Sequence, residues 1–295
     1  MVETHQNTPS SKSVTLHYTV EEFALLPKTG KSEDCEDAIY IGPHFVAVID
    51  GVTSKTARRW DGLTGGRIAA STLQEAFDQI PFDATARQAV NILSDAIKRL
   101  YESYDVLESM QANPVQRVTA AFVAVSLWRK EVWFVGDCQC LLNQEHIQHP
   151  MRIDEITANA RSLFLESEIA QGKTIEELLQ HDTGREYIQP LLERQMLFQN
   201  TPSAGQYWFP VIGGFEVPDE GIHVQGLPTD IETIVLASDG YPYLKRSLHE
   251  SEQALQEVLQ DDPLLFRKYK ATKGVREGHI SFDDRAYVKL KIKKD

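Results

Sequence analysis

Cysteine is scarce in this sequence, whose 295 residues contain only Cys35, Cys138 and Cys140. The number is odd, no two of them form a CxxC pair, and their spacing is not that of a disulfide-rich protein. Disulfide frameworks belong to oxidising compartments and usually use an even number of cysteines. The scarcity therefore favours a reducing compartment.

Long apolar runs are also missing. No stretch approaches the roughly 20 apolar residues that a membrane-spanning helix requires. The opening residues, MVETHQNTPSSKS, are polar and lack the apolar segment of a secretory signal. The sequence thus predicts a cytoplasmic protein with no membrane span.

Basic residues are too few to balance the acidic ones. Lys and Arg total 30 against 43 Asp and Glu, which gives a formal net charge of -13. This deficit argues against nucleic acid as a partner, because phosphate backbones are bound by a surplus of basic side chains. It also disfavours an anionic membrane surface. With 42% hydrophobic residues, the chain is expected to be globular, with one large core or two modest ones.

Strand-like and helix-like segments come in blocks after a loose tail predicted over residues 1–12. Apolar and β-branched runs predict strands at 13–20, 38–42, 45–50, 117–128, 131–137, 140–143, 206–215, 233–240 and 285–292. Helical spacing predicts helices around 68–77, 84–104 and 250–269. Blocks of this kind favour an antiparallel α+β sandwich over a wound βαβ sheet.

One stretch differs from the rest. Residues 151–200 have helical patterns without strand signals, with capping boxes predicted at Thr174 to Glu177 and Thr183 to Glu186. We therefore expect a helical insert at 151–200 within a single domain spanning 13–295.

Five aspartates lie at the boundaries of predicted strands: Asp37, Asp50, Asp137, Asp239 and Asp283. A single Asp-Gly after an apolar run is most often a turn. Five such positions are harder to explain as turns, because neighbouring strands would bring the carboxylates together at one edge. Repulsion between them would then require cations.

The ligand type indicates which cation. All five residues offer oxygen, and no nearby histidine or cysteine spacing indicates zinc, so Mg²⁺ or Mn²⁺ is expected. Two such ions, about 3.5 to 4 Å apart, share a carboxylate and activate a water in many phosphatases. The sequence therefore predicts hydrolase chemistry without a side-chain nucleophile.

The order of these motifs resembles the metal-dependent protein phosphatases, the type 2C serine/threonine family. The resemblance extends from Lys31 to Ile292 and is carried by EDA at 36–38, VIDG at 48–51, VGDCQ at 135–139, LASDG at 236–240 and SFDDRAYV at 281–288. It implies a four-layer α-β-β-α sandwich. It also implies a phosphoserine and phosphothreonine phosphatase that acts by in-line attack of a water or hydroxide bridging two metal ions.

The resemblance also implies roles for individual residues. Asp50 would bridge two ions, the Gly51 carbonyl would bind one of them, and Asp239 and Asp283 the other. Glu36 and Asp37 would hold metal-bound waters. Asp137 with Asp239 would form a weaker third site. The expected partner is a phosphorylated protein, and a monomer is the default.

Several positions depart from the family pattern: Arg117 and Val118 replace small residues, Asp284 replaces a common asparagine, and two further positions concern the chemistry directly. Ser32 stands where an arginine usually grips the substrate phosphate, and Val52 stands where many members have a histidine. The general acid is therefore unassigned. Basic residues gather around the first two motifs at Lys28, Lys31, Lys55, Arg58, Arg59 and Arg67. From this group Lys31 with Arg58 or Arg59 is predicted to bind phosphate.

Two alternatives stay open at this point. The first is a metal-binding relative that hydrolyses poorly and acts as a regulatory module, which Ser32 and Val52 would permit. The second is a haloacid-dehalogenase-like phosphatase, because VIDGVTS faintly resembles the Asp-x-Asp motif of that family. Val52 occupies the place of its second aspartate.

Overall fold

Two five-stranded sheets form the centre of the structure, which is a computed structural model that describes residues 15–293. Neighbouring strands in both sheets are antiparallel. The first sheet has the order β1 (His17–Leu26), β10 (Arg285–Lys293), β9 (Thr233–Ala237), β6 (Gln139–Leu142) and β7 (Glu145–Gln148). The second has the order β2 (Asp37–Ile41), β3 (Phe45–Gly51), β4 (Ala120–Ser126), β5 (Glu131–Val135) and β8 (His223–Gly226). The predicted 1–12 tail lies outside the described residues.

The two sheets face each other across an apolar core, and β3 shows why. Val46 and Val48 pack between the sheets, whereas Phe45, Ala47 and Ile49 pack against the helical side. Because successive side chains of a strand point to opposite faces, a strand buried on both faces is apolar throughout. The alternation also places Asp50 on the same face as Val48, so its carboxylate points between the sheets.

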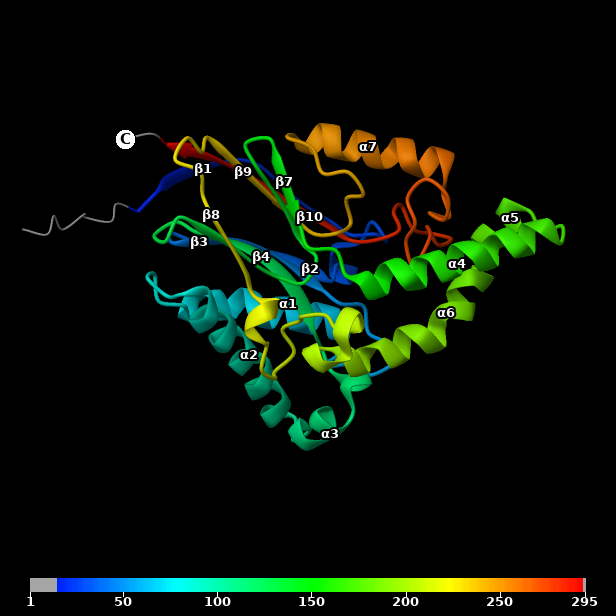
Figure 1. Cartoon of the computed structure of the whole chain (residues 1–295), viewed down its shortest axis with the longest axis horizontal. Helices are drawn as coiled ribbons and strands as arrows, with labels where there is room; N and C mark the ends of the chain where they lie inside the picture. The colour runs from blue at the N-terminus through cyan, green and yellow to red at the C-terminus, as the bar shows by residue number, and fades with distance from the viewer. Residues whose placement is uncertain (1–14, 294–295) are drawn as a thin grey trace, which may run out of the picture.

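Helices cover the outer face of each sheet (Figure 1). On the second sheet lie α1 (Gly65–Ala76) and α2 (Ala86–Ser103), with α3 (Leu107–Ala112) following. On the other side lies α7 (Leu248–Asp261), whose Glu252 forms an ion pair with Arg285 of β10 at 2.9 Å. The predicted four-layer α-β-β-α sandwich is confirmed.

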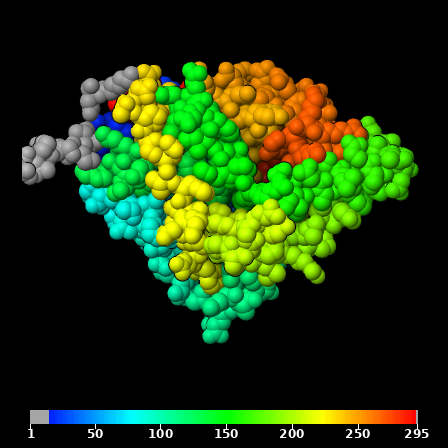
Figure 2. All heavy atoms as spheres, in the orientation of Figure 1, coloured from blue at the N-terminus to red at the C-terminus, as the bar shows by residue number. Residues whose placement is uncertain are grey.

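The segment predicted as a helical insert contains α4 (Arg152–Ala170), α5 (Ile175–Gln180) and α6 (Thr183–Arg194). These helices extend from one end of the sandwich (Figures 1 and 2). The capping box at Thr174 and Glu177 is present. The box predicted at Thr183 is wrong: Asp182 caps α6 by accepting from the backbone N–H of Arg185.

Arg161 of α4 connects the insert to the rest of the molecule. Its side chain is fully buried and donates to Asp182 Oδ2 at 2.6 Å. The same guanidinium donates to the carbonyl oxygens of Leu265 at 3.3 Å and Ala271 at 3.0 Å. One side chain therefore holds α4, the start of α6 and the 262–272 segment together.

We predict that Arg161→Leu lowers the free energy of unfolding by about 3 kcal/mol, because a carboxylate and two carbonyls lose a charged donor in a buried place. Urea denaturation measures this loss. The matched control is Arg152→Leu on the same helix, whose exposed pair with Glu155 is expected to contribute less than about 1 kcal/mol. Equal losses in the two variants would contradict the anchoring role.

Several predicted elements differ from the structure. The strand predicted at 206–215 is wrong, because this segment makes only isolated bridges, from Phe209 to Gln199 and from Ile212 to Ala120. The helix predicted to run to residue 269 ends at Asp261, since Pro263 follows and Asp262 Oδ2 accepts three backbone N–H groups in a turn. Strands β7 and β8 were not predicted. Within residues 15–293, no helix combines the length and apolarity needed to cross a bilayer.

Candidate active site

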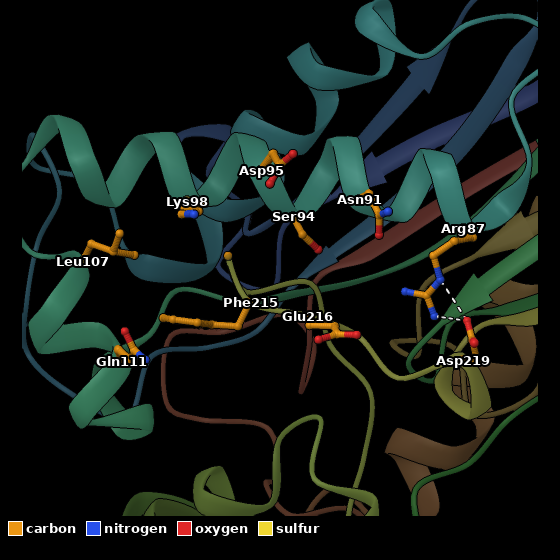
Figure 3. A pocket seen from close by; sticks show the side chains of 11 residues that line it. Arg87, Asn91, Ser94, Asp95, Lys98, Leu107, Gln111, Phe215, Glu216 and Asp219 are labelled. Carbon is orange, nitrogen blue, oxygen red and sulfur yellow. Dashed lines mark hydrogen bonds and ion pairs between the residues drawn. The ribbon is translucent and has the colours of Figure 1, made fainter.

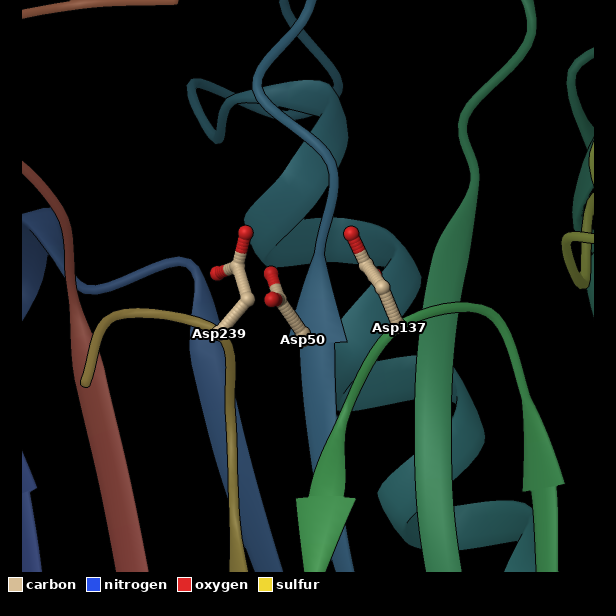
Figure 4. Close-up of side chains that lie close together, drawn as sticks. All are labelled: Asp50, Asp137 and Asp239. Atoms are coloured by element: carbon tan, nitrogen blue, oxygen red, sulfur yellow. The ribbon is translucent and has the colours of Figure 1, made fainter. Parts of the chain in front are cut away.

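Three aspartates from both sheets meet at one end of the sandwich (Figure 4). Asp50 lies in β3, Asp137 follows β5, and Asp239 follows β9. Each offers a carboxylate oxygen, and these oxygens all lie within 4.8 Å of one another. Among the described residues this is the one group of three or more such side chains whose ligand atoms approach so closely. We call it the acidic cluster.

Asp50 and Gly51 are not turn residues. Asp50 pairs with Asp37 of β2 on one side and with Ala121 of β4 on the other. A Cβ on Gly51 would lie 2.2 Å from the Gly66 carbonyl oxygen and 2.3 Å from that of Glu36, so this position requires glycine. The Asp-Gly pair therefore continues a strand and brings a carboxylate to its end.

Burial and mutual repulsion act on the acidic cluster together. The pKa of Asp50 is raised well above its usual range by burial and by Asp239 and Asp37. Burial and then Asp239 raise the pKa of Asp137 in the same way. Burial followed by repulsion from Asp283 raises the pKa of Asp239 to about 6. Positive charge from the chain therefore does not offset the repulsion: Lys273 lowers the pKa of Asp239, but only in part.

Asp37 lies directly beside this cluster. Its side chain is 6% exposed, and its Oδ2 is buried with no hydrogen-bond partner. Burial and repulsion from Asp284 raise its pKa well above the usual range. A buried oxygen without a donor normally indicates a missing water or ion. Together with the acidic cluster it fits a hard divalent cation, which takes carboxylate oxygens as ligands and keeps water ligands.

Asp283 and Glu36 are in a different environment, because lysines neutralise them. Lys28 Nζ lies 3.1 Å from Glu36 Oε2, 3.0 Å from Asp284 Oδ2 and 3.5 Å from Asp283 Oδ1. Lys273 forms a second ion pair with Asp283. Burial opposes ionisation of Asp283, but Lys273 and Lys28 lower its pKa overall. Asp283, a predicted metal ligand, is therefore outside the acidic cluster of three.

Glu36 and Asp284 hold the segment between β1 and β2 in place through hydrogen bonds. Glu36 Oε2 accepts from the Thr53 hydroxyl at 2.7 Å; burial opposes ionisation of Glu36, but Lys28 together with hydrogen bonds from Thr64 and Thr53 lowers its pKa overall. Asp284 accepts from the backbone N–H of Lys28 at 2.8 Å and from that of Glu36 at 3.1 Å. Asp284 thus ties the β1–β2 connection to the start of β10.

The acidic cluster opens into a cavity of about 320 Å³. The sandwich contributes Asp50, Asp137, Asp239 and Asp283, and the insert contributes Asp154 and Arg185. The basic residues on its wall are Lys55, Arg185, Lys270 and Lys273. Arg185, Lys270 and Lys273 were not predicted, since they lie far along the chain from the first two motifs, and the packing of α6 and the 262–283 segment brings them here.

The residues predicted to bind phosphate do not line this cavity. Lys31 is exposed at the start of a short 3-10 helix, and Arg59 is exposed as well. The Arg58 guanidinium lies 4.3 Å from the ring centroid of Trp60, where a cation–π contact holds it. Of the six basic residues grouped in the sequence, only Lys55 reaches the cavity wall.

A larger cavity, of about 680 Å³, lies between α2, α3 and the 214–219 segment (Figure 3). Its lining includes Asp95, Glu216 and Asp219, and Asp219 is paired with Arg87. These carboxylates do not converge on a common point, so the smaller cavity is the candidate active site.

No family model and no curated protein matches this sequence. Among solved structures, the chain is similar to the serine/threonine phosphatase PstP/Ppp of Mycobacterium tuberculosis, at 16% identity over 95% of this chain and 100% of that one, with a TM-score of 0.46. It is also similar to the serine/threonine phosphatase Stp1 of Staphylococcus aureus, at 16% identity over 97% of this chain and 100% of that one, with a TM-score of 0.46. A third similar structure is RsbX in complex with magnesium, at 11% identity over 94% of this chain and 100% of that one, with a TM-score of 0.41. At these levels of similarity, the functional assignment depends on the residues of the site itself.

Proposed function

We propose that this chain is a metal-dependent phosphatase that hydrolyses phosphoserine and phosphothreonine in proteins. The observation that carries the proposal is the convergence of Asp50, Asp137 and Asp239 from both sheets on one cavity. These are the same residues whose order in the sequence resembles the type 2C family. A monomeric, cytoplasmic protein acting on phosphorylated proteins is the simplest form of the proposal.

The proposed ligands fall into two groups. Asp50 would hold two Mg²⁺ or Mn²⁺ ions, with the Gly51 carbonyl on one and Asp239 and Asp283 on the other. Asp137 with Asp239 would hold a weaker third ion. When bound, such ions polarise a phosphoryl group and lower the pKa of water.

The chain itself positions and holds the water. Asp37 offers a buried acceptor oxygen without a partner, suited to a water proton. Glu36 is fixed by Lys28 and Thr53, so its remaining acceptor capacity is held in place. Burial of both side chains excludes bulk water and strengthens these contacts.

Hydrolysis of p-nitrophenyl phosphate tests the proposal. We expect turnover with Mn²⁺, loss of turnover with a chelator, and recovery when Mn²⁺ is added back, because the buried carboxylates need cations. If metal-loaded protein shows no turnover on this ester or on a broad phosphopeptide panel, the proposed phosphatase function is wrong. A trapped phospho-intermediate on Asp50 would favour the haloacid-dehalogenase alternative instead.

A regulatory, poorly hydrolysing module is the second candidate, and the surroundings of Asp283 favour it. Lys273 and Lys28 already neutralise this predicted ligand, which would weaken the ion that depends on it. Calorimetric titration with Mn²⁺ separates the two candidates. A single weak binding event without turnover would favour the regulatory module, and two events with turnover the phosphatase.

A further inference from the structure

Three basic side chains form a recess on the cavity wall beside the acidic cluster. They are Lys55 from the segment after β3, Arg185 from α6 of the insert, and Lys273 from the segment before β10. We call them the cationic recess. The three come from widely separated parts of the sequence, and all are partly buried.

Lys55 has no carboxylate partner within the part of the chain that the structure describes. Its Nζ donates to the Thr53 carbonyl oxygen at 2.9 Å. Burial, followed by repulsion from Arg185 and Lys273, lowers its pKa to about 8. The Lys55 ammonium is therefore held close to two other cations without an anion bound to it.

Arg185, like Lys55, donates to a backbone carbonyl oxygen. Its Nη1 donates to the Thr272 carbonyl oxygen at 2.9 Å, while its Nε is buried with no hydrogen-bond partner. Burial, then repulsion from Arg276 and Arg161, lowers its pKa to about 10. Within residues 15–293 it forms no ion pair, so its charge is offset only at a distance.

The carboxylates around the recess only partly offset this charge. Asp283 is paired with Lys273. Asp154 of α4 lines the same cavity and accepts from Gln195 Nε2 at 3.2 Å, and the three cations counteract the effect of burial on its pKa. Lys55 and Arg185 thus line the cavity without an ion pair among the described residues, and a charged group with no partner in a partly buried place is costly.

We infer that the cationic recess binds the nonbridging oxygens of the substrate's phosphoryl group, with Lys55 and Arg185 as its binding residues. The inference rests on the proposed phosphatase function. Lys55 and Arg185 would take the role of the arginine that Ser32 replaces. Among the described residues only Nη1 of the Arg185 guanidinium is hydrogen-bonded, so planar donors remain that suit a phosphate oxygen, and the Lys55 ammonium adds a point charge. The recess lies in the cavity that holds the acidic cluster, where a phosphoryl group would be attacked.

Because Arg185 belongs to α6, the helical insert would contribute directly to phosphate binding and would not only shape the entrance. Lys31, Arg58 and Arg59, which do not line the cavity, would contribute little.

Calorimetric titration with inorganic phosphate tests the recess. With Mn²⁺-loaded wild type we expect binding, and Arg185→Met and Lys55→Met should each weaken it about 10- to 30-fold, as for the loss of a charge-assisted hydrogen bond. The matched controls are Arg194→Met on the exposed side of α6 and Lys31→Met, which should bind phosphate as the wild type does. In the two Met variants the KM for p-nitrophenyl phosphate should rise as phosphate affinity falls, while Mn²⁺ affinity stays unchanged.

The outcomes separate the recess from the proposed function. Wild-type phosphate affinity in both Met variants would overturn the recess, whatever the turnover. Phosphate binding that depends on Lys55 and Arg185 in a protein without turnover would support the recess and reject the phosphatase. If Arg185→Met fails to fold, as circular dichroism would show, Arg185→Lys and Lys55→Met decide, since Arg185→Lys keeps the charge and loses only the planar donor pair.

Discussion

Asp50→Asn is expected to lower Mn²⁺-dependent kcat/KM on p-nitrophenyl phosphate by about 10³-fold or more. Asp50 occupies the centre of the acidic cluster, where a carboxylate shared between two ions would be replaced by a neutral amide. Lost stabilisation of this kind is worth several kcal/mol of the activation barrier. Steady-state kinetics over a Mn²⁺ titration measures the loss. The matched control is Asp95→Asn on α2, which is exposed and lines the other cavity.

The same variant should make the metal-free protein more stable. Because burial and repulsion from Asp239 and Asp37 raise the pKa of Asp50, its ionised form is disfavoured in the folded state. Removing that charge is expected to raise the free energy of unfolding by about 1–2 kcal/mol at pH 7.5 in chelator. Added Mn²⁺ should then stabilise the wild type more than the variant. A metal-free variant less stable than the wild type would show that the cluster is not under repulsion.

The gain in stability should depend on pH with a definite sign. A carboxyl whose pKa is raised on folding contributes stability below its unfolded pKa and loses that contribution as the pH rises through the folded value. For Asp239 this window runs from 3.8 to about 6. The advantage of Asp50→Asn should therefore be present at pH 7.5 and fade towards pH 4, where the wild-type carboxyls hold protons. Urea denaturation at both pH values measures the difference.

Lys28→Met is expected to lower the free energy of unfolding by about 4–5 kcal/mol. Lys28 Nζ contacts Glu36, Asp283 and Asp284, and two of these side chains are 5% exposed or less. Burial works against the ammonium, yet Asp283, Glu36 and Asp284 together raise its pKa well above the usual value. Removing it leaves buried carboxylates unpaired, which is among the most destabilising changes that a single substitution makes.

Urea denaturation of the metal-free protein measures this loss, because bound cations would otherwise mask it. The control is Lys31→Met, three residues away and exposed, for which a change within about 0.5 kcal/mol is expected. A loss below about 1 kcal/mol in Lys28→Met would show that Glu36, Asp283 and Asp284 do not depend on this ammonium. Mn²⁺ should restore part of the stability, since it would bind Asp283.

Most of the strand pattern was predictable because it depends on local alternation. The run at 45–50 and the alternating residues at 285–292 became β3 and β10, and three of the five aspartates predicted at strand boundaries form the acidic cluster. The wrong strand prediction at 206–215 also has a local cause. The 206–215 segment has apolar and aromatic residues typical of a strand, yet Pro210 removes a backbone donor and only isolated bridges form.

The charges around the cavity were much harder to predict. Basic residues near the first two motifs were an obvious choice for binding phosphate, but Arg58 lies over Trp60 and Lys31 is exposed. Apart from Lys55, the basic residues on the cavity wall are separated from those motifs by more than 100 residues. Lys55 lines the cavity because it follows shortly after β3, which ends at Gly51 beside the acidic cluster.

The sequence by itself determined the layered α+β architecture and the aspartates of the acidic cluster, because strand periodicity and the residue that ends each strand are local properties. Only the tertiary structure decided which charges meet. It placed Lys28 and Lys273 on Asp283, left Asp37 with an unpartnered oxygen, and brought Arg185 from the insert to the cavity. The physical reason is that pairing, burial and repulsion depend on distances between segments, which no local pattern records.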